Sequence, residues 1–410
     1  MRYFIILLFF GICEVSLAQA ENTPTAPKKD SIDRNDGIID VLEEKESLRN
    51  ERNSDDYRSK NNESIQSKKV SKKEVYKSTE APAINSGGIS TRQQTIQAES
   101  ENFGYYKVQS QSQTQQRSPT PAQQSQMDGT VSYFEMNAPQ SFEYHYFKYT
   151  SGNYNTDLYS HLAAAEKLKP NNADVQVQLV AYHMINNSTT EALNYLDKLI
   201  ENKRLTKSVV LYAEDVLRSV PTNGVLITHG FDDTYGVWYA QIKNGIRKDV
   251  QILSLDLMQS EKYRSELKTK GFNLPNAEII DVSFLSQFCS MNASENISIS
   301  LTAPKDYFKP ILSSVYLTGL VFEYKTSSFD NFWRNEALWN NELKKSLVDD
   351  ALDDKGRALL SNYLPMLFQM RKVYGQTGKK EKVKEMDGAI DKIGAQSNKY
   401  QQVQKMKSAY

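Results

Sequence analysis

One stretch of the chain, Pro221–Leu257, constrains the fold more than any other. Two short apolar runs, Val225–Thr228 and Val250–Leu255, flank one amphipathic segment. This pattern predicts a β-α-β unit with two parallel strands. Open α/β sheets bind their ligands at the carboxyl ends of their strands. The acidic loop His229–Thr234, which follows the first strand, is therefore where a binding site is expected.

The N-terminus predicts export from the cytoplasm. In Met1–Ala20 a single arginine precedes an apolar run, and Ala18-Gln19-Ala20 then has the small-x-small pattern of a signal-peptidase site. We therefore expect a cleavable signal peptide over residues 1–20 and a periplasmic or secreted protein. The apolar run is shorter than the roughly 20 residues that span a bilayer, and no later segment comes close. No membrane span is expected in the mature chain.

Residues 21–138 predict a disordered polar linker. Their composition is dominated by Lys, Glu, Ser, Gln, Asn, Thr and Pro. Such a segment cannot bury enough apolar surface to offset the entropy of ordering its backbone. The tract Gln109–Gln126, rich in Gln and Ser, is typical of a linker. Such an arm is either a tether for a partner or a spacer, and the sequence leaves both open.

Charge and cysteine content argue against a nucleic-acid-binding protein and against a protein held together by disulfides. Lys+Arg and Asp+Glu are balanced at 50 each, so no global basic field exists to recruit nucleic acid, and no nucleic-acid partner is expected. Only one cysteine, Cys289, lies beyond the predicted signal peptide, so no intramolecular disulfide is expected. Cys289 lies in an apolar run and is expected to be a buried small hydrophobe.

Amphipathic helices are predicted on both sides of the β-α-β unit, over residues 139–220 and 329–410. The run Ala165–Asp174 resembles the hairpin junction of tetratricopeptide repeats, whose period is about 34 residues. A generic stack of helical hairpins is the alternative. The polar C-terminal residues are expected to fray. The helices predicted in the first of these regions are Thr156–Leu168, Asp174–Met184, Thr189–Ile200 and Leu205–Val220.

Residues 221–328 form the predicted α/β domain. The sequence thus predicts an α/β fold class with helical-hairpin flanks, in which a small, mostly parallel sheet packs with tetratricopeptide-like helices. A long disordered N-terminal arm precedes this folded part. Beyond the β-α-β unit, the further segments predicted as strands are Glu278–Val282 and Ile297–Leu301. The apolar run Val315–Tyr324 is either a strand or a buried segment interrupted at Gly319.

Five residues of the loop and of the helix after it are candidate ligand-binding residues. The imidazole and carboxylates could meet a metal ion or a sugar hydroxyl, and the indole could stack on a carbohydrate. The structural alternative is that Asp or Thr side chains cap the helix and the indole packs against the sheet. Neither metal-ligand spacing nor a nucleotide or nucleophile motif is present, so no catalytic residue, metal or cofactor is predicted. The five residues are His229, Asp232, Asp233, Thr234 and Trp238.

The same stretch carries a resemblance to a known family. Its matching residues are Thr228, Gly230, Asp233, Thr234, Trp238, Tyr239, Gly245, Ile246, Arg247, Asp249 and Val250. They resemble a strand ending in Thr-Asn-Gly-Asp-Asn-Asp-Thr, an aromatic pair, and a Gly-Val-Arg-x-Asp-Val element. These elements are found in a bacterial family of large polytopic membrane proteins of unknown function, related to protein O-mannosyltransferases. The run Tyr316–Phe322 looks like a later element of that family, so the resemblance spans about Leu205–Ile393.

The departures from the family pattern limit what the resemblance implies. His229, Phe231 and Asp232 stand where the family has Asn, Asp and Asn. The membrane-embedded part, in which sugar transfer would take place, is absent from this sequence. The resemblance therefore implies the soluble accessory module alone.

We expect a non-enzymatic binding or scaffold protein of the cell envelope, whose helical-hairpin and α/β surfaces bind a protein or peptide partner. The alternative is a carbohydrate-active or glycosylation-associated enzyme or accessory module with its site at the His229–Asp233 loop. That site would need further acidic groups, and Asp256, Glu278 and Asp281 are the ones near predicted strand ends. The sequence favours the non-enzymatic protein but leaves the enzyme open.

Overall fold

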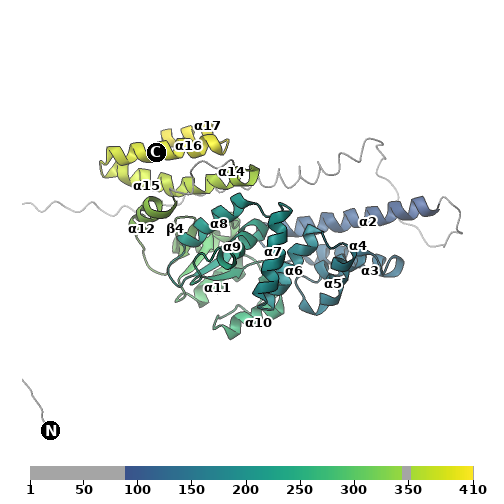
Figure 1. Ribbon diagram of the computed structural model, residues 1–410. Coiled ribbons are helices and arrows are strands. Elements are labelled where there is room, and N and C mark those ends of the chain that lie inside the picture. The colour runs from purple at the N-terminus through teal and green to yellow at the C-terminus, as the bar shows by residue number, and fades with distance from the viewer. Residues whose placement is uncertain (1–87, 344–351, 410) are drawn as a thin grey trace, which may run out of the picture.

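The computed structural model describes residues 88–343 and 352–409. Most of this part is helical, and a five-stranded sheet lies among the helices (Figure 1). The predicted fold class, an α/β sheet with helical flanks, is confirmed. The predicted signal peptide and residues 21–87 of the predicted linker lie outside the described residues. Within the described ranges, no helix combines the length and apolar character needed to cross a membrane.

The sheet is mixed, whereas the sequence predicted a mostly parallel one. β1 pairs in parallel with β2 and β3, and β5 pairs antiparallel with β3 and β4. The strand order is β2-β1-β3-β5-β4. The antiparallel half arises because the apolar run Val315–Tyr324 is a hairpin that reverses at Gly319, where φ is +58°. The strands are β1 Val225–Thr228, β2 Gln251–Ser254, β3 Ile297–Ser300, β4 Val315–Thr318 and β5 Val321–Tyr324.

The strand predicted at Glu278–Val282 is wrong. These residues form a loop, and helix α11 (Val282–Met291) begins at their end. Asp281 is the N-cap of this helix and accepts a hydrogen bond from the backbone N–H of Phe284 at 2.8 Å. The cap ends the extended run, because it starts a helix where the apolar residues alone suggested a strand. On α11, Cys289 is buried as predicted, and burial raises the pKa of its thiol to about 12.

Helices cover both faces of the sheet. β1 leads through α9 (Gly230–Ile242) to β2, and β2 leads through α10 (Glu261–Thr269) and α11 to β3. Because β2 and β3 lie on opposite sides of β1, right-handed connections place α9 on one face and α10 and α11 on the other. Helix α8 (Lys207–Ser219) packs closely on α9, since a Cβ on Gly236 would lie 3.0 Å from a methyl group of Val209.

Helical hairpins precede the sheet. The four predicted helices are present as α5, α6, α7 and α8, with a 3-10 turn over Thr156–Leu158 before α5. Polar caps set several of their starts: Asn172 caps α6, and Thr206 caps α8. Apolar side chains of α6 and α7 join the same hydrophobic core as the sheet. The remaining helices of this region are α4 Phe142–Ser151, α5 Tyr159–Leu168, α6 Ala173–Ile185 and α7 Thr189–Glu201.

The prediction of a disordered linker is wrong over residues 88–137, which form α2 (Gly88–Gln111) and α3 (Pro121–Asn137). These helices and α4 share a small hydrophobic cluster of their own, in which the rings of Phe103 and Phe147 stack 4.1 Å apart. A few aromatic residues at helical spacing are enough to form it within a polar composition. Pro121 begins a helix because its fixed φ suits the first helical position.

Helices also follow the sheet, and Figure 1 shows α16 and α17 at the upper left, on the opposite side of the picture from α3. The C-terminal residues, predicted to fray, form α17, which packs on α16 through Gly394 and Val403. Lys407 of α17 forms ion pairs with Asp387 and Asp391 of α16. Trp333 of α12 is 63 % exposed. These elements are α12 Phe332–Leu338, the π-helix Trp339–Leu343, α14 Asp354–Leu360, α15 Leu364–Gln376, α16 Lys380–Gln396 and α17 Tyr400–Ala409.

Candidate functional site

The carboxyl ends of β1, β2 and β3 meet at one edge of the sheet. The connections from β1 to β2 and from β2 to β3 run in opposite directions across the sheet, so the carboxyl ends of β1 and β3 form a topological switch point. Ligands of open α/β sheets bind at such a point. The residues that follow the three strands are His229 and Gly230, Leu255 and Asp256, and Leu301 and Thr302.

Asp233 lies at this switch point, and both of its carboxylate oxygens accept hydrogen bonds from other groups of the protein. One carboxylate oxygen accepts the backbone N–H of His229 at 2.8 Å, at the start of α9. The other accepts the hydroxyl of Ser300, at the end of β3, at 2.9 Å. The residue is 6 % exposed. This geometry agrees with the structural interpretation, in which Asp233 serves the helix start, and adds a link to β3.

Thr234 serves the same junction. Its hydroxyl donates to the hydroxyl of Thr228 at 2.9 Å, and the hydroxyl of Thr228 donates to the carbonyl of Leu253 at 3.3 Å. Both threonines are buried. The chain of bonds links α9 to β1 and β2, which holds the first turn of the helix against the sheet edge.

The other predicted site residues do not join Asp233. Asp232 points to α14, where it forms an ion pair with Lys355 at 2.8 Å. Trp238 is buried, and its ring lies 5.1 Å from that of Tyr235. His229 is buried with its ring 6.4 Å from that of Tyr307. The five predicted residues therefore do not form a single site.

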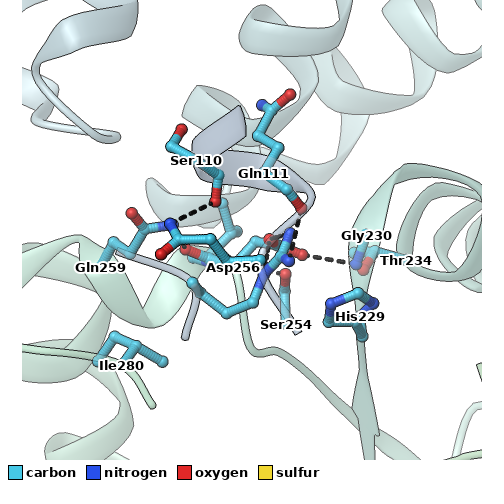
Figure 2. Close-up of polar contacts among 12 residues, drawn as sticks. Ser110, Gln111, His229, Gly230, Thr234, Ser254, Asp256, Gln259 and Ile280 are labelled. Atoms are coloured by element: carbon cyan, nitrogen blue, oxygen red, sulfur yellow. Dashed lines mark hydrogen bonds and ion pairs between the residues drawn. The ribbon is translucent and has the colours of Figure 1, made fainter. Parts of the chain in front are cut away.

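Asp256 is the acidic group that this edge is built around. One of its oxygens accepts the backbone N–H of Gly230 at 2.6 Å, and the other accepts Nε of Arg117 at 2.7 Å and contacts Nη2 of the same side chain. Figure 2 shows Asp256 between Gly230 and the end of α2 at Gln111. Of the acidic groups expected near strand ends, Asp256 alone reaches the edge, because Asp281 caps α11 and Glu278 is exposed.

Charges and hydrogen bonds keep Asp256 ionised despite its burial. Burial alone would raise the pKa of this carboxyl. The charge of Arg117 opposes that effect most strongly, and His229 and the hydrogen bonds from Arg117 and Gly230 add to it. The pKa of Asp256 therefore lies below its ordinary value.

Arg117 is the residue of the candidate site that sequence reasoning missed. It lies between α2 and α3 and is 6 % exposed. Besides Asp256, its guanidinium binds the carbonyl of Gln111 at 3.0 Å, and its backbone N–H donates to the carbonyl of Ile280 at 2.6 Å. One signal was present: Arg117 is the single charged residue of the tract Gln109–Gln126.

A second cation lies near this ion pair. Lys107 of α2 donates to the carbonyl of Thr150 at 2.8 Å. Burial lowers the pKa of Lys107 to about 8, against the opposing influence of Asp256 and with the support of Arg117. The turn that Lys107 holds places Tyr154 in the left-handed region, with φ at +65°. Arg117 is therefore the basic side chain that binds Asp256, and Lys107 interacts with that carboxylate through its charge alone.

The acidic side chains of this edge bind other groups of the protein. Within residues 88–343 and 352–409, no three His, Cys, Asp or Glu side chains are grouped to hold a metal ion. Asp233 and Asp256 each accept hydrogen bonds from a helix start and from a second element. The edge is thus a network that joins α9, β3 and the α2–α3 connection.

Comparison with known protein families places part of this chain in relation to one of them. Residues 209–366 match the family model of TMEM260-associated domain 2. This segment begins in α8, contains the whole sheet and ends in α15. It covers less than half of the chain and excludes Arg117. The match is consistent with a TMEM260-related family over the stretch that carries the resemblance, and the link to protein O-mannosyltransferases stays a prediction. No curated protein and no solved structure matches the chain significantly.

Proposed function

We propose that this protein is a non-enzymatic binding or scaffold protein of the cell envelope, which holds a protein or peptide partner on its helical-hairpin and α/β surfaces. The commitment of Asp233 and Asp256 to backbone and side-chain partners carries the proposal. A catalytic acid or base must reach the proton that it transfers in the bound substrate. Carboxylates bound to a helix start and to Arg117 or Ser300 are better suited to holding the sheet edge together.

A band of aromatic rings across the hairpins supports a protein or peptide partner. Tyr159 of α5 stacks on Tyr182 of α6 with ring centroids 4.2 Å apart. His183 stacks on Tyr195 of α7 at 5.7 Å, and Lys198 lies 4.6 Å above the ring of Tyr195. Tyrosine gives large contact area at low entropic cost and is enriched at protein interfaces. We define Tyr159, Tyr182, His183 and Tyr195 as the aromatic band and propose it as the partner-binding surface, within hairpins of tetratricopeptide type.

A capture experiment tests this proposal. The purified full chain and its Tyr159→Ala variant are incubated with envelope extract, and bound proteins are identified. Tyr159 is 37 % exposed, so its replacement removes contact area with little effect on the core. Loss of a central aromatic contact is expected to reduce the amount of captured partner at least about tenfold. The control is Tyr400→Ala on α17, a tyrosine that is 51 % exposed. Failure to capture any partner, or equal capture by both variants, would contradict the proposal.

The envelope location rests on the N-terminal sequence pattern and has its own test. Expression of the full chain in a bacterial host, followed by fractionation and intact mass measurement, should give a protein outside the cytoplasm that lacks residues 1–20. A cytoplasmic protein of full mass would contradict the proposed export.

A second candidate function is a glycosylation-associated accessory module. It is supported by the family-model match over residues 209–366, which contains the His229–Thr234 loop, and by the resemblance to a family related to protein O-mannosyltransferases. Calorimetric titration of the full chain with a mannosylated peptide and its unmodified form tests it. Preference for the mannosylated form, lost in Asp256→Asn, is the expected result. Equal affinity for the two peptides would exclude this candidate.

A further inference from the structure

The segment between α2 and α3, Ser112–Ser118, is bent along most of its length and pairs with residues 280–282 through one β-bridge. The carbonyl of Gln115 accepts the backbone N–H of Val282 at 3.0 Å, and the backbone N–H of Arg117 donates to the carbonyl of Ile280 at 2.6 Å. These two bonds form an antiparallel bridge between Gln116 and Asp281. This bridge docks the segment on the loop before α11 through backbone hydrogen bonds of the kind that an added peptide makes.

The side chains of the segment meet acidic groups. Arg117 forms the ion pair with Asp256, and the hydroxyl of Thr114 donates to a carboxylate oxygen of Asp306 at 2.5 Å. The hydroxyl of Ser118 accepts the backbone N–H of Ile280 at 3.1 Å. An arginine aimed at a buried carboxylate gives both charge and directional hydrogen bonds, which makes it the specific contact of the segment.

Ser112–Ser118 has the features of a peptide bound to a separate folded part. From Ser112 to Ser118, all described, Arg117 is the one buried side chain. The helices on either side of it pack in a hydrophobic cluster that is separate from the main core. The groups that receive the segment, Asp256, Ile280, Asp281 and Asp306, all lie within the family-matched residues 209–366, whereas the segment lies outside them.

We propose that this edge is a binding site for a peptide segment that carries an arginine, and that Ser112–Ser118 fills the site in cis. The inference rests on the proposed binding function and names a second surface for it. A partner peptide would pair with residues 280–282, and its arginine would replace Arg117 on Asp256. An attached segment acts at an effective concentration of about millimolar, so the site stays filled until a stronger or better-presented peptide displaces the segment.

The test uses a labelled synthetic peptide, Ser-Gln-Ser-Gln-Thr-Gln-Gln-Arg-Ser-Pro, which reproduces residues 110–119. Fluorescence anisotropy follows its binding to the full chain. Arg117→Ala should bind it at least about tenfold more tightly than wild type, because loss of a charged hydrogen bond weakens the competing segment. Arg92→Ala, a change of an exposed arginine on α2, should bind it as wild type does. The same peptide with alanine for arginine should not bind, and Arg117→Ala/Asp256→Asn should not bind the original peptide.

A second measurement keeps the test decisive if Arg117→Ala does not fold. Wild type is mixed with excess peptide, and hydrogen exchange at the backbone amide of Arg117 is followed. Displacement breaks its bond to Ile280 and should speed its exchange at least about tenfold. Unchanged exchange, or peptide binding that ignores the arginine, would overturn the inference. The two proposals can fail separately. If Tyr159→Ala loses partner capture but the peptide does not bind, the proposed function is supported and this inference alone is refuted.

Discussion

Replacing Asp256 by alanine should lower the free energy of unfolding by about 3–5 kcal/mol, the usual loss when one partner of a buried ion pair is removed. The structure gives the reason for this magnitude. Arg117 is 6 % exposed, so after the substitution its positive charge would stay buried without the carboxylate that it now binds. The backbone N–H of Gly230 would also lose its acceptor at the start of α9. A loss of this size is a large share of the stability of an ordinary domain, about 5–15 kcal/mol.

A double-mutant cycle measures the part that belongs to the ion pair. Denaturant unfolding followed by far-UV circular dichroism is carried out for wild type, Asp256→Ala, Arg117→Ala and the double variant. The double variant should lose clearly less than the sum of the two single losses, because neither charge remains buried alone. Additive losses, or a loss below about 1 kcal/mol for Asp256→Ala, would refute the reasoning.

The same pair predicts a pH dependence with a definite sign. The folded pKa of Asp256 is lowered from its ordinary value of 3.8. Its contribution to stability is therefore complete above pH 3.8 and is lost as the pH falls through the folded pKa. Thermal melts of wild type between pH 6 and pH 2 should show this loss, and Asp256→Asn should show a smaller slope in that range.

Three further changes test other parts of the fold. Asp233→Ala should lower the free energy of unfolding by about 1–3 kcal/mol with or without calcium or magnesium, and a metal-dependent rise of the wild-type melting point would contradict its structural role. The rings of His145 and His161 are in contact through their Nδ1 atoms at 3.0 Å, and burial is the main cause that lowers the pKa of each below 6.5. The contribution of this pair to stability should therefore be complete above pH 6.5 and be lost as the pH falls through the folded pKa values. The pH profile of stability should be flatter in His161→Gln. Gly319→Ala should lower the free energy of unfolding in a thermal melt by more than about 1 kcal/mol, because its Cβ would lie 2.3 Å from a serine hydroxyl. Gly375→Ala in α15 should not destabilise the protein, because its Cβ would enter open space.

The sequence predicted those elements whose cause is local. β1 is a run of four apolar or β-branched residues after Pro221, and its observed bounds are the predicted ones. Helices α5 to α8 follow from apolar residues at helical spacing and from polar caps such as Asn172 and Thr206. The loop after β1 was expected at the carboxyl edge because that placement follows from β-α-β topology alone.

The sequence could not predict contacts between distant segments. Arg117 and Asp256 are 139 residues apart, and nothing in a tract of Gln and Ser indicates that its one charge is buried. Average composition also concealed α2 and α3, since Phe103 and Phe134 gain their burial from Phe147 of α4. Likewise α17 is ordered by Val403 against Gly394, a contact that its polar sequence does not announce.

The family-matched segment and the folded unit have different boundaries. The main core unites the sheet with Leu196 of α7 and Ile390 of α16, both outside residues 209–366. Within that segment, Asp256 would keep the N–H of Gly230 but would have no Arg117. Any chain that shares this segment and its buried aspartate must supply a counter-charge or leave the aspartate to protonate, because an unpaired buried carboxylate is strongly disfavoured. In this protein the counter-charge comes from the α2–α3 connection. The part of the fold outside the matched segment therefore determines the electrostatic state of the edge at which the β-α-β topology places a ligand.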